Sequence, residues 1–201
     1  MGLPGPRPGT RVSRRDGTCS FHLPQRGPRQ YGDVMTEFDW REEPVPAGLP
    51  VRQVHGWLAD ETGRFLLQNR VHEQKFLLPG GHCDSGDDGW TDTWLRECQE
   101  ESQVRVVRES VAYLGRQVVT GDPRAAGPYV QVRLFGVIEA VDPSAPDPDS
   151  GYTYLRLMTS AALAARLLAW GRPGEQQARA AALAGHRLGL PTNQPPADSY
   201  V

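Results

Sequence analysis

The sequence of 201 residues lacks several features that define other classes of protein. It has one lysine, Lys75, among 22 basic residues, a bias that suggests a GC-rich genome more than a function. Its three cysteines are an odd number in unrelated contexts, which argues against a disulfide framework. No apolar run approaches the ~18 residues that span a bilayer. A net charge of −2 does not favour a stable nucleic-acid partner. From the cysteine usage and the lack of a long apolar run we expect a cytoplasmic protein without a membrane segment.

Composition divides the chain into three parts. Residues 1–34 are rich in Gly, Pro and Arg, and they cannot bury enough surface to offset the entropy of ordering, so we predict disorder there. Residues 35–190 alternate apolar segments with turn signals, which predicts one domain whose ordered structure begins near Val51. Residues 191–201 are predicted to form a flexible tail.

Apolar periodicity and turn residues predict the elements of this domain. Strands are predicted over 51–59, 64–71, 76–78, 111–119, 130–141 and 152–158. Helices are predicted over 90–101 with Asp88 as the N-cap, after Thr159 or Ser160, and over 175–187. The order of these elements predicts a mixed α/β layered domain: strands come first, then an acidic helix, further strands and terminal helices.

The segment 80–104, GGHCDSGDDGWTDTWLRECQEESQV, holds the densest group of chemically useful side chains. At about 100° per residue, Glu97, Glu100 and Glu101 fall within roughly a 100° arc of one helix face. Charges this close destabilise a bare helix, and a cation such as Mg²⁺, which prefers oxygen ligands, would remove the penalty. The alternative is an ordinary solvated helix face. The preceding Gly80-Gly81 bend and the adjoining apolar stripe favour a cation site.

This strand, glycine-rich loop and acidic helix resembles the signature of the Nudix hydrolase family, G-x5-E-x7-R-E-U-x-E-E-x-G-U with U apolar. Gly81 supplies the opening glycine, residues 96–101 the core, and Val104 the closing apolar position. The resemblance extends over roughly residues 50–188 and implies the family's fold, a Nudix-like layered α/β/α sandwich with a mixed sheet.

The chain departs from that signature at three places. Asp87 stands where the family has glutamate, and eight residues instead of seven separate it from Arg96. Gln103 replaces the glycine after the helix, where a left-handed residue often ends it. These departures motivate one alternative, a Nudix-like module that binds a nucleotide or regulatory ligand without cleaving it.

The resemblance implies metal-dependent hydrolysis of a pyrophosphate bond in a nucleoside diphosphate linked to another group. The expected ligands of Mg²⁺ or Mn²⁺ are Glu97, Glu100, Glu101, Asp87 and a carbonyl of Gly80 or Gly81. The expected catalytic residues are Glu100, Glu101 and Arg96, with Arg96 holding the glutamates by ion pairing. Family members often take a general base from a later loop, for which Glu139 and Asp142 are candidates.

Candidates for substrate binding lie outside the signature. Arg70 would contact a phosphate of the substrate. An equally good alternative is that Arg70 lies at the solvent-exposed end of a strand and binds no ligand. Tyr152 and Arg156 would stack on a nucleoside or form hydrogen bonds with it. The stronger interpretation is that both belong to an ordinary exposed face of the sheet without a binding role. The expected partner is a small-molecule nucleotide, and the sequence does not identify its leaving group. The resemblance also makes a homodimer possible, because members of the family are often dimers. A third hypothesis, an isomerase of allylic diphosphates, lacks a suitably placed pair of catalytic Cys and Glu.

Overall fold

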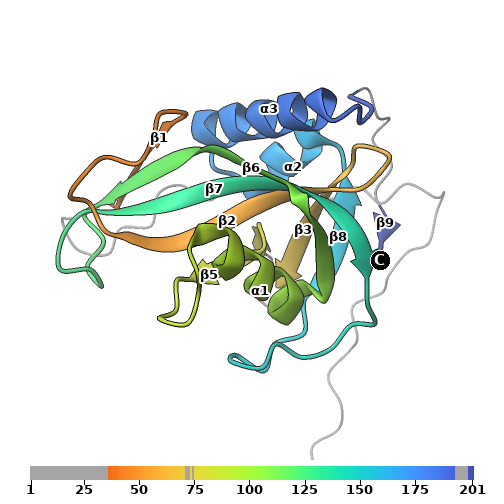
Figure 1. The fold of residues 1–201 in the computed structure, drawn as a ribbon, viewed down its shortest axis with the longest axis horizontal. Coiled ribbons are helices and arrows are strands. Elements are labelled where there is room, and N and C mark those ends of the chain that lie inside the picture. Colours follow the sequence, from red (N-terminus) through yellow and green to blue (C-terminus); the bar gives the residue numbers. More distant parts are fainter. Residues whose placement is uncertain (1–35, 71–72, 74, 193–198) are drawn as a thin grey trace, which may run out of the picture.

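The computed structural model describes residues 36–70, 73, 75–192 and 199–201, so the predicted disordered leader lies outside the described residues. The strands are β1 (Glu37–Arg41), β2 (Val51–Ala59), β3 (Phe65–Arg70), β4 (Lys75–Leu77), β5 (Gly80–His82), β6 (Val104–Thr120), β7 (Tyr129–Val141), β8 (Leu155–Thr159) and β9 (Ser199–Tyr200). The helices are α1 (Trp90–Ser102), α2 (Ala161–Leu168) and α3 (Arg172–Arg187). Figure 1 shows α1 on one side of the sheet and α2 with α3 on the other. The predicted layered α/β fold with a mixed sheet is confirmed.

The strands form one sheet in the order β1-β6-β7-β2-β3-β8-β9, with β4 paired to β3 and β5 paired to β2. β2 and β7 pair in parallel, whereas the other described pairs are antiparallel. Gln53–His55 of β2 pairs with β5, and Leu58–Ala59 pairs with β3. The central strand β2 therefore carries the glycine-rich strand at one end and the β3–β8 side of the sheet at the other.

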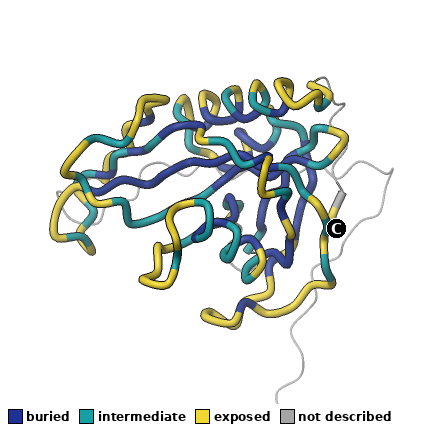
Figure 2. Tube along the Cα trace, viewed as in Figure 1, coloured by how far each residue is buried: buried dark blue, intermediate teal, exposed yellow. Residues whose placement is uncertain are grey.

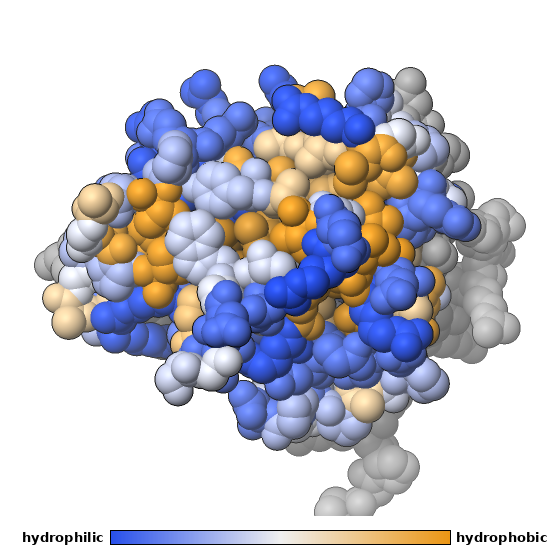
Figure 3. Space-filling view, in the orientation of Figure 1, coloured by the Kyte–Doolittle hydropathy of each residue, from blue (hydrophilic) through white to orange (hydrophobic). Residues whose placement is uncertain are grey.

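Each face of the sheet has its own hydrophobic core, because side chains alternate between the two faces along each strand. Trp57 and Phe135 lie in the core beneath α2 and α3, and both are fully buried. Val54, Leu58 and Trp94 lie in the core beneath α1. Figure 2 shows the buried strands between more exposed helices and loops. In the view of Figure 3, hydrophilic side chains cover the outer surface of α3, and hydrophobic ones gather between α3 and α1.

Trp94 fixes the position of α1 on the sheet. Its indole is fully buried, and a Cβ added at Gly56 of β2 would lie 2.2 Å from it, so only glycine leaves room for the ring there. The indole Nε1 donates to the Pro79 carbonyl at 3.2 Å, and the Gly56 N–H donates to the same carbonyl at 3.0 Å. The helix, the central strand and the residue before the diglycine are thereby tied together.

Several predicted boundaries differ from the structure. Strand β6 begins at Val104, seven residues before the predicted start at 111, and α3 begins at Arg172, three residues before the predicted start at 175. Ordered structure was expected to begin near Val51, which is wrong, because the earlier strand β1 pairs with β6 at the edge of the sheet. The N-cap of α1 is Gly89 and not Asp88, and no side chain caps that end of the helix. The last long strand begins at Leu155, three residues after the predicted Tyr152.

The C-terminal residues also differ from the prediction of a flexible tail over 191–201. Ser199–Tyr200 pairs with β8 as strand β9, and the Val201 N–H donates to the Arg156 carbonyl at 3.0 Å. Residues 193–198 lie outside the described residues.

None of the helices in the described ranges has the length and hydropathy that a bilayer crossing needs.

Candidate active site

Glu101 lies at the C-terminal part of α1, against the diglycine strand. Its Oε2 accepts hydrogen bonds from the Gly80 N–H and from Gln68 Nε2, both at 2.9 Å. Burial raises the pKa of this carboxyl, although the two donors act in the opposite direction. Gln68 also donates to Ser102 Oγ at 2.9 Å, so its amide is held in place on β3. The sequence-predicted pair of Glu101 and Gly80 is thus brought together.

Glu97 lies one helical turn earlier and contacts the second glycine of the loop. A Cβ added at Gly81 would lie 2.4 Å from its Oε1, so a side chain there would displace the carboxylate. Burial and the charge of Glu101 raise the pKa of Glu97 to about 7, and Arg96 opposes that shift. Glu97 and Glu101 therefore place two crowded, half-buried carboxylates beside the backbone of the glycine loop.

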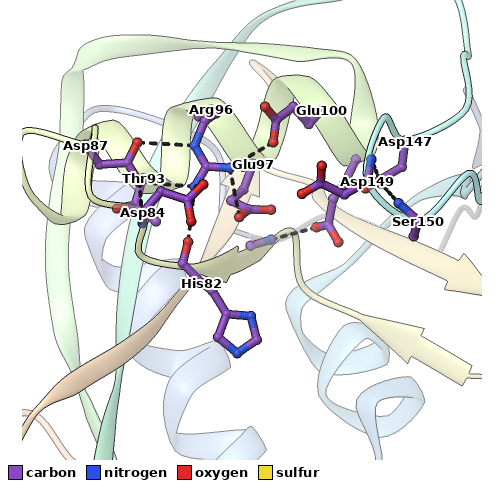
Figure 4. A network of polar contacts seen from close by, with 12 residues as sticks. His82, Asp84, Asp87, Thr93, Arg96, Glu97, Glu100, Asp147, Asp149 and Ser150 are labelled. Carbon is purple, nitrogen blue, oxygen red and sulfur yellow. Dashed lines mark hydrogen bonds and ion pairs between the residues drawn. The ribbon is translucent and has the colours of Figure 1, made fainter.

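Arg96 connects the acidic groups of the loop and the helix (Figure 4). Its Nη1 donates to Glu97 Oε1 at 3.1 Å and to Glu100 Oε2 at 2.8 Å. Its Nη2 donates to the His82 carbonyl of β5 at 3.1 Å. One guanidinium therefore holds two of the three helix glutamates, as the sequence predicted for this residue, and ties them to the strand that contains the diglycine.

Asp87 and Glu100 occupy a different place from the other predicted ligands. Arg96 donates to both carboxylate oxygens of Asp87, at 3.2 Å and 3.1 Å, and this contact holds the pKa of Asp87 well below its usual range. Within the described chain, the groove that receives Glu97 and Glu101 is lined by neither Asp87 nor Glu100. The structure therefore places both carboxylates on Arg96, and the altered residue at position 87 keeps a contact with the arginine.

Gln103 ends α1 in the left-handed conformation, with φ 49° and ψ 42°. Its side-chain Nε2 donates to the Glu100 carbonyl at 2.9 Å, and its Oε1 accepts from the Ala145 N–H at 3.1 Å. A left-handed residue that is not glycine costs about 1–2 kcal/mol, which these two bonds offset. Gln103 thus performs the helix-ending role of the family's glycine and also contacts the loop after β7.

That loop brings a further carboxylate to the site. Asp147 is 7% exposed, and its charge contributes to the raised pKa of Glu101. Its Oδ1 accepts hydrogen bonds from the N–H groups of Asp149 and Ser150 at 2.9 Å and 2.6 Å. All three residues line the groove (Figure 4). The sequence analysis did not single out Asp147: its Asp-Pro-Asp-Ser-Gly segment carries a turn signal, but nothing in it places the side chain beside Glu101.

The two residues that were predicted as general bases lie elsewhere. Asp142 forms an ion pair with Arg105 at 3.6 Å, and Glu139 is exposed on β7. Neither lines the groove in the described part of the chain. Asp147, five residues beyond Asp142, lines the groove instead.

The groove has a volume of about 640 Å³ and is lined by basic as well as acidic side chains. Arg70 and Lys75, on β3 and β4, line it together with Glu97 and Glu101. Arg70 donates to the Tyr154 hydroxyl at 2.8 Å, and its guanidinium lies 5.3 Å from the Tyr154 ring centroid. The predicted phosphate-binding residue is therefore held within the groove by an aromatic neighbour.

The other two predicted substrate contacts are placed outside the groove as the described residues define it. Tyr152 is 50% exposed and lies 5.5 Å from the Arg70 guanidinium. Arg156 is buried, and its Nη1 donates to the carbonyls of Ser102 and Asp142 at 3.0 Å and 2.8 Å. Arg156 therefore joins the end of α1 to the start of the Asp147 loop.

The donor set fits a hard divalent cation. In the described ranges, no three or more His, Cys, Asp or Glu side chains are close enough to ligate one ion. Mg²⁺ is usually held by one or two carboxylates with water and substrate phosphates, so Glu97 and Glu101 suffice for such a site. Burial is the largest cause of the raised pKa of both carboxyls, and neighbouring carboxylates add to it; a bound cation would favour their charged forms.

The family of this domain follows from a comparison with protein-family models. The model described as NUDIX domain matches residues 49–178, which is more than half of the chain. The chain belongs to the Nudix family. The family resemblance that its residues carry is therefore confirmed, and the matched region runs from just before β2 into α3. The comparison with curated proteins found no match.

Similar solved structures include a mutant of the Bacillus subtilis pyrophosphohydrolase BsRppH, with 22% identity, 55% of this chain and 65% of that chain covered, and a TM-score of 0.47. The C. elegans Ap4A hydrolase has 15% identity, coverages of 64% and 93%, and a TM-score of 0.45. The E. coli dihydroneopterin triphosphate pyrophosphohydrolase has 12% identity, coverages of 63% and 94%, and a TM-score of 0.46. The chain thus spans just under two thirds of BsRppH, and these likenesses carry no argument about activity.

Proposed function

We propose that this Nudix protein hydrolyses a pyrophosphate bond in a nucleoside diphosphate linked to another group, with Mg²⁺ or Mn²⁺ as cofactor. The observation that carries the proposal is the position of Glu97 and Glu101, two half-buried carboxylates beside the Gly80-Gly81 backbone in a groove that also holds basic side chains. Family membership supports hydrolase activity on pyrophosphate bonds.

Glu97 and Glu101 would hold the cation, with Gly80 or Gly81 supplying a backbone oxygen. A bound divalent cation neutralises developing phosphate charge and lowers the pKa of a bound water. Arg96 acts as a positioning residue, because it fixes Glu97 by an ion pair at 3.1 Å and holds the carbonyl of His82, the residue after the diglycine. Glu100 shares that guanidinium, so its proposed contribution to catalysis is exerted through Arg96 or after Arg96 releases it.

Arg70 and Asp147 complete the proposed chemistry. Arg70, oriented by the Tyr154 hydroxyl, would bind phosphate oxygens of the substrate. Asp147 lines the same groove as Glu97 and Glu101, and its Oδ1 is occupied by two backbone N–H groups. Its Oδ2 would accept the proton of the attacking water, which is the role of a general base.

A product-release assay over nucleotides, nucleotide sugars and dinucleotides, with Mg²⁺ and with Mn²⁺, tests the proposal. We expect metal-dependent hydrolysis that falls about 100-fold or more in Glu97→Gln and Glu101→Gln, because each loses a ligand charge. Glu109→Gln, at an exposed position on β6, is the matched control and should retain activity. If the whole panel survives with both metals, the proposal is wrong, and binding without turnover becomes the better description of the domain.

We also propose a cytoplasmic location, a small-molecule nucleotide as the substrate, no stable nucleic-acid partner, and a homodimer. The near-balanced charge and the absence of an apolar run in the sequence support the first of these. Light scattering of the purified protein tests the homodimer, for which a mass of about twice 22.2 kDa is expected.

A further inference from the structure

Three glutamines lie side by side on the floor of the groove, beyond the acids. Gln53 of β2 pairs with Gln131 of β7, and Gln131 pairs with Gln117 of β6. Directly paired residues of neighbouring strands project from the same face of the sheet, so the three amides form a row. All three line the groove. We call this row the amide ladder.

Arg133 fixes the direction of the amide ladder. It is 3% exposed, and its Nη2 donates to Oε1 of Gln117 at 2.7 Å and to Oε1 of Gln131 at 2.8 Å. A guanidinium only donates hydrogen bonds, so both amides must turn their oxygens towards Arg133. Their Nε2 groups are then the ends that remain for other partners. The Gln131 Nε2 donates to Gln53 Oε1, whereas the Gln117 Nε2 donates to no described residue.

Arg133 is also a buried cation without a counter-ion among the described residues. Burial lowers the pKa of its guanidinium to about 9. Its Nε donates to Gln177 Oε1 at 3.1 Å and its Nη1 to the Val132 carbonyl at 3.3 Å. Four of its five N–H groups are therefore in use, which leaves one. Arginine frequently binds phosphate through two parallel N–H donors, so the single remaining donor is better suited to one acceptor atom of a ligand.

Aromatic side chains stand at the rim of the same part of the groove. Phe38, on the edge strand β1, lines the groove although it is 48% exposed. Trp170 also lines it, with one face 5.5 Å from the Arg133 guanidinium. An exposed aromatic face beside a row of amide donors suits a flat heterocycle, which buries its face on the ring and offers its edge to the amides.

We propose that the amide ladder, together with Arg133 and Phe38, binds the nucleobase of the substrate through its carbonyl and ring-nitrogen acceptors. The inference rests on the proposed function, because it places the pyrophosphate at the acids and the base farther along the same groove. The two ends are adjacent: Gln53 Nε2 lies 3.2 Å from His82 Nε2, and His82 directly follows Gly81. The Gln117 Nε2 and the last N–H of Arg133 are the donors that such an edge would meet.

Binding measured by calorimetry in the presence of Mn²⁺ tests the inference without turnover. The probes are guanosine 5′-monophosphate, uridine 5′-monophosphate and the base-free ribose 5-phosphate. We expect the wild-type protein to bind at least one nucleotide about tenfold or more tightly than ribose 5-phosphate, since a neutral hydrogen bond and ring stacking each contribute on that order. Equal affinity for all three probes would overturn the inference, whatever the variants do.

Two variants distinguish a glutamine that contacts the nucleobase from one that only holds the Arg133 guanidinium in place. Gln117→Glu keeps an oxygen for Arg133 but replaces the donor with an acceptor, so it should weaken nucleotide binding about tenfold and leave ribose 5-phosphate unchanged. Gln177→Glu is the matched control, because Gln177 makes the same kind of contact with Arg133 and does not belong to the described lining of the groove. It should preserve the difference between nucleotide and ribose 5-phosphate. Equal losses for both probes in Gln117→Glu would indicate a phosphate site and contradict the inference.

The hydrolysis assay distinguishes failure of this inference from failure of the proposed function. If the protein cleaves pyrophosphate bonds but binds base-free and base-bearing probes equally, the function stands and the nucleobase site is wrong. If it binds nucleotides with a base preference but cleaves none of the panel, the nucleobase site stands and the domain is a binding module.

Discussion

Arg96 holds both carboxylate oxygens of Asp87, with Nε 3.2 Å from Oδ1 and Nη2 3.1 Å from Oδ2. A two-point contact of this kind fixes the plane of the guanidinium as well as its position. The same group then presents Nη1 to Glu97 and Glu100. An aspartate in place of the family's glutamate is therefore compatible with an oriented arginine, although the loop is one residue longer.

The first prediction concerns this orientation. Arg96→Lys keeps the positive charge but cannot contact Asp87 at two points and Glu97 at a third, so we expect kcat to fall about 10- to 100-fold. Steady-state kinetics with saturating Mn²⁺ measure the effect, and circular dichroism establishes that the variant is folded. Arg105→Lys, at an exposed position on β6, is the control. Unchanged kcat in a folded Arg96→Lys variant would contradict a positioning role.

The second prediction concerns the contact between Gly81 and Glu97. Gly81→Ala would place a methyl group within 2.4 Å of the Glu97 carboxylate, and the flexible end of that side chain should move aside while the fold persists. We expect Mn²⁺ affinity to fall about tenfold or more, because the displaced carboxylate no longer meets the ion. Titration calorimetry measures this affinity. Gly86→Ala, in the same loop with no atom within 4 Å, should bind Mn²⁺ like the wild-type protein.

The third prediction concerns the left-handed end of α1. Gln103→Ala keeps the unfavourable backbone conformation and loses both side-chain hydrogen bonds, whereas Gln103→Gly loses the bonds but relieves the backbone. We expect the alanine variant to be less stable than the glycine variant by about 1 kcal/mol. Urea unfolding curves for the two variants measure this difference directly. An alanine variant as stable as the glycine variant would show that position 103 is not left-handed in solution.

The fourth prediction concerns the pH dependence of stability. Burial, followed by the charge of Arg133, lowers the pKa of His55 from 6.5 to about 3, although a hydrogen bond to the Leu78 backbone opposes the shift. The charges of His82 and Lys75 act in the same direction as Arg133. Between pH 6.5 and pH 3 the unfolded chain therefore binds more protons than the folded one. The stability that neutral His55 contributes is complete above pH 6.5 and is lost as the pH falls.

His55→Asn removes this titration, so its free energy of unfolding should fall less steeply on acidification, by up to about 1.4 kcal/mol per pH unit. Denaturant unfolding at a series of pH values between 7 and 4 provides the curve. His186→Asn, on the exposed surface of α3, should retain the slope of the wild-type protein. Parallel curves for His55→Asn and the wild-type protein would show that His55 is protonated as readily in the folded state as in the unfolded chain.

The sequence predicted those features that depend on local spacing. The helix from Trp90, the ion pairs of Arg96 and the contact of Glu101 with the diglycine follow from residues within about 20 positions of one another. It could not predict Asp147, because its place beside Glu101 depends on how β7 and β8 bring a distant loop back to α1. Arg156 was misjudged for a similar reason, since its partners are carbonyl groups brought near it only by tertiary structure.

The side chain of Gln103 joins the last turn of α1 to the loop that carries Asp147. Arg156 bridges the same two segments through the carbonyls of Ser102 and Asp142. With two independent cross-links between them, Glu101 of α1 and Asp147 of the loop should move together as a single rigid unit. The proposed hydrolysis would then need no closure of these two segments on the substrate, and its rate would be set by substrate entry and product release.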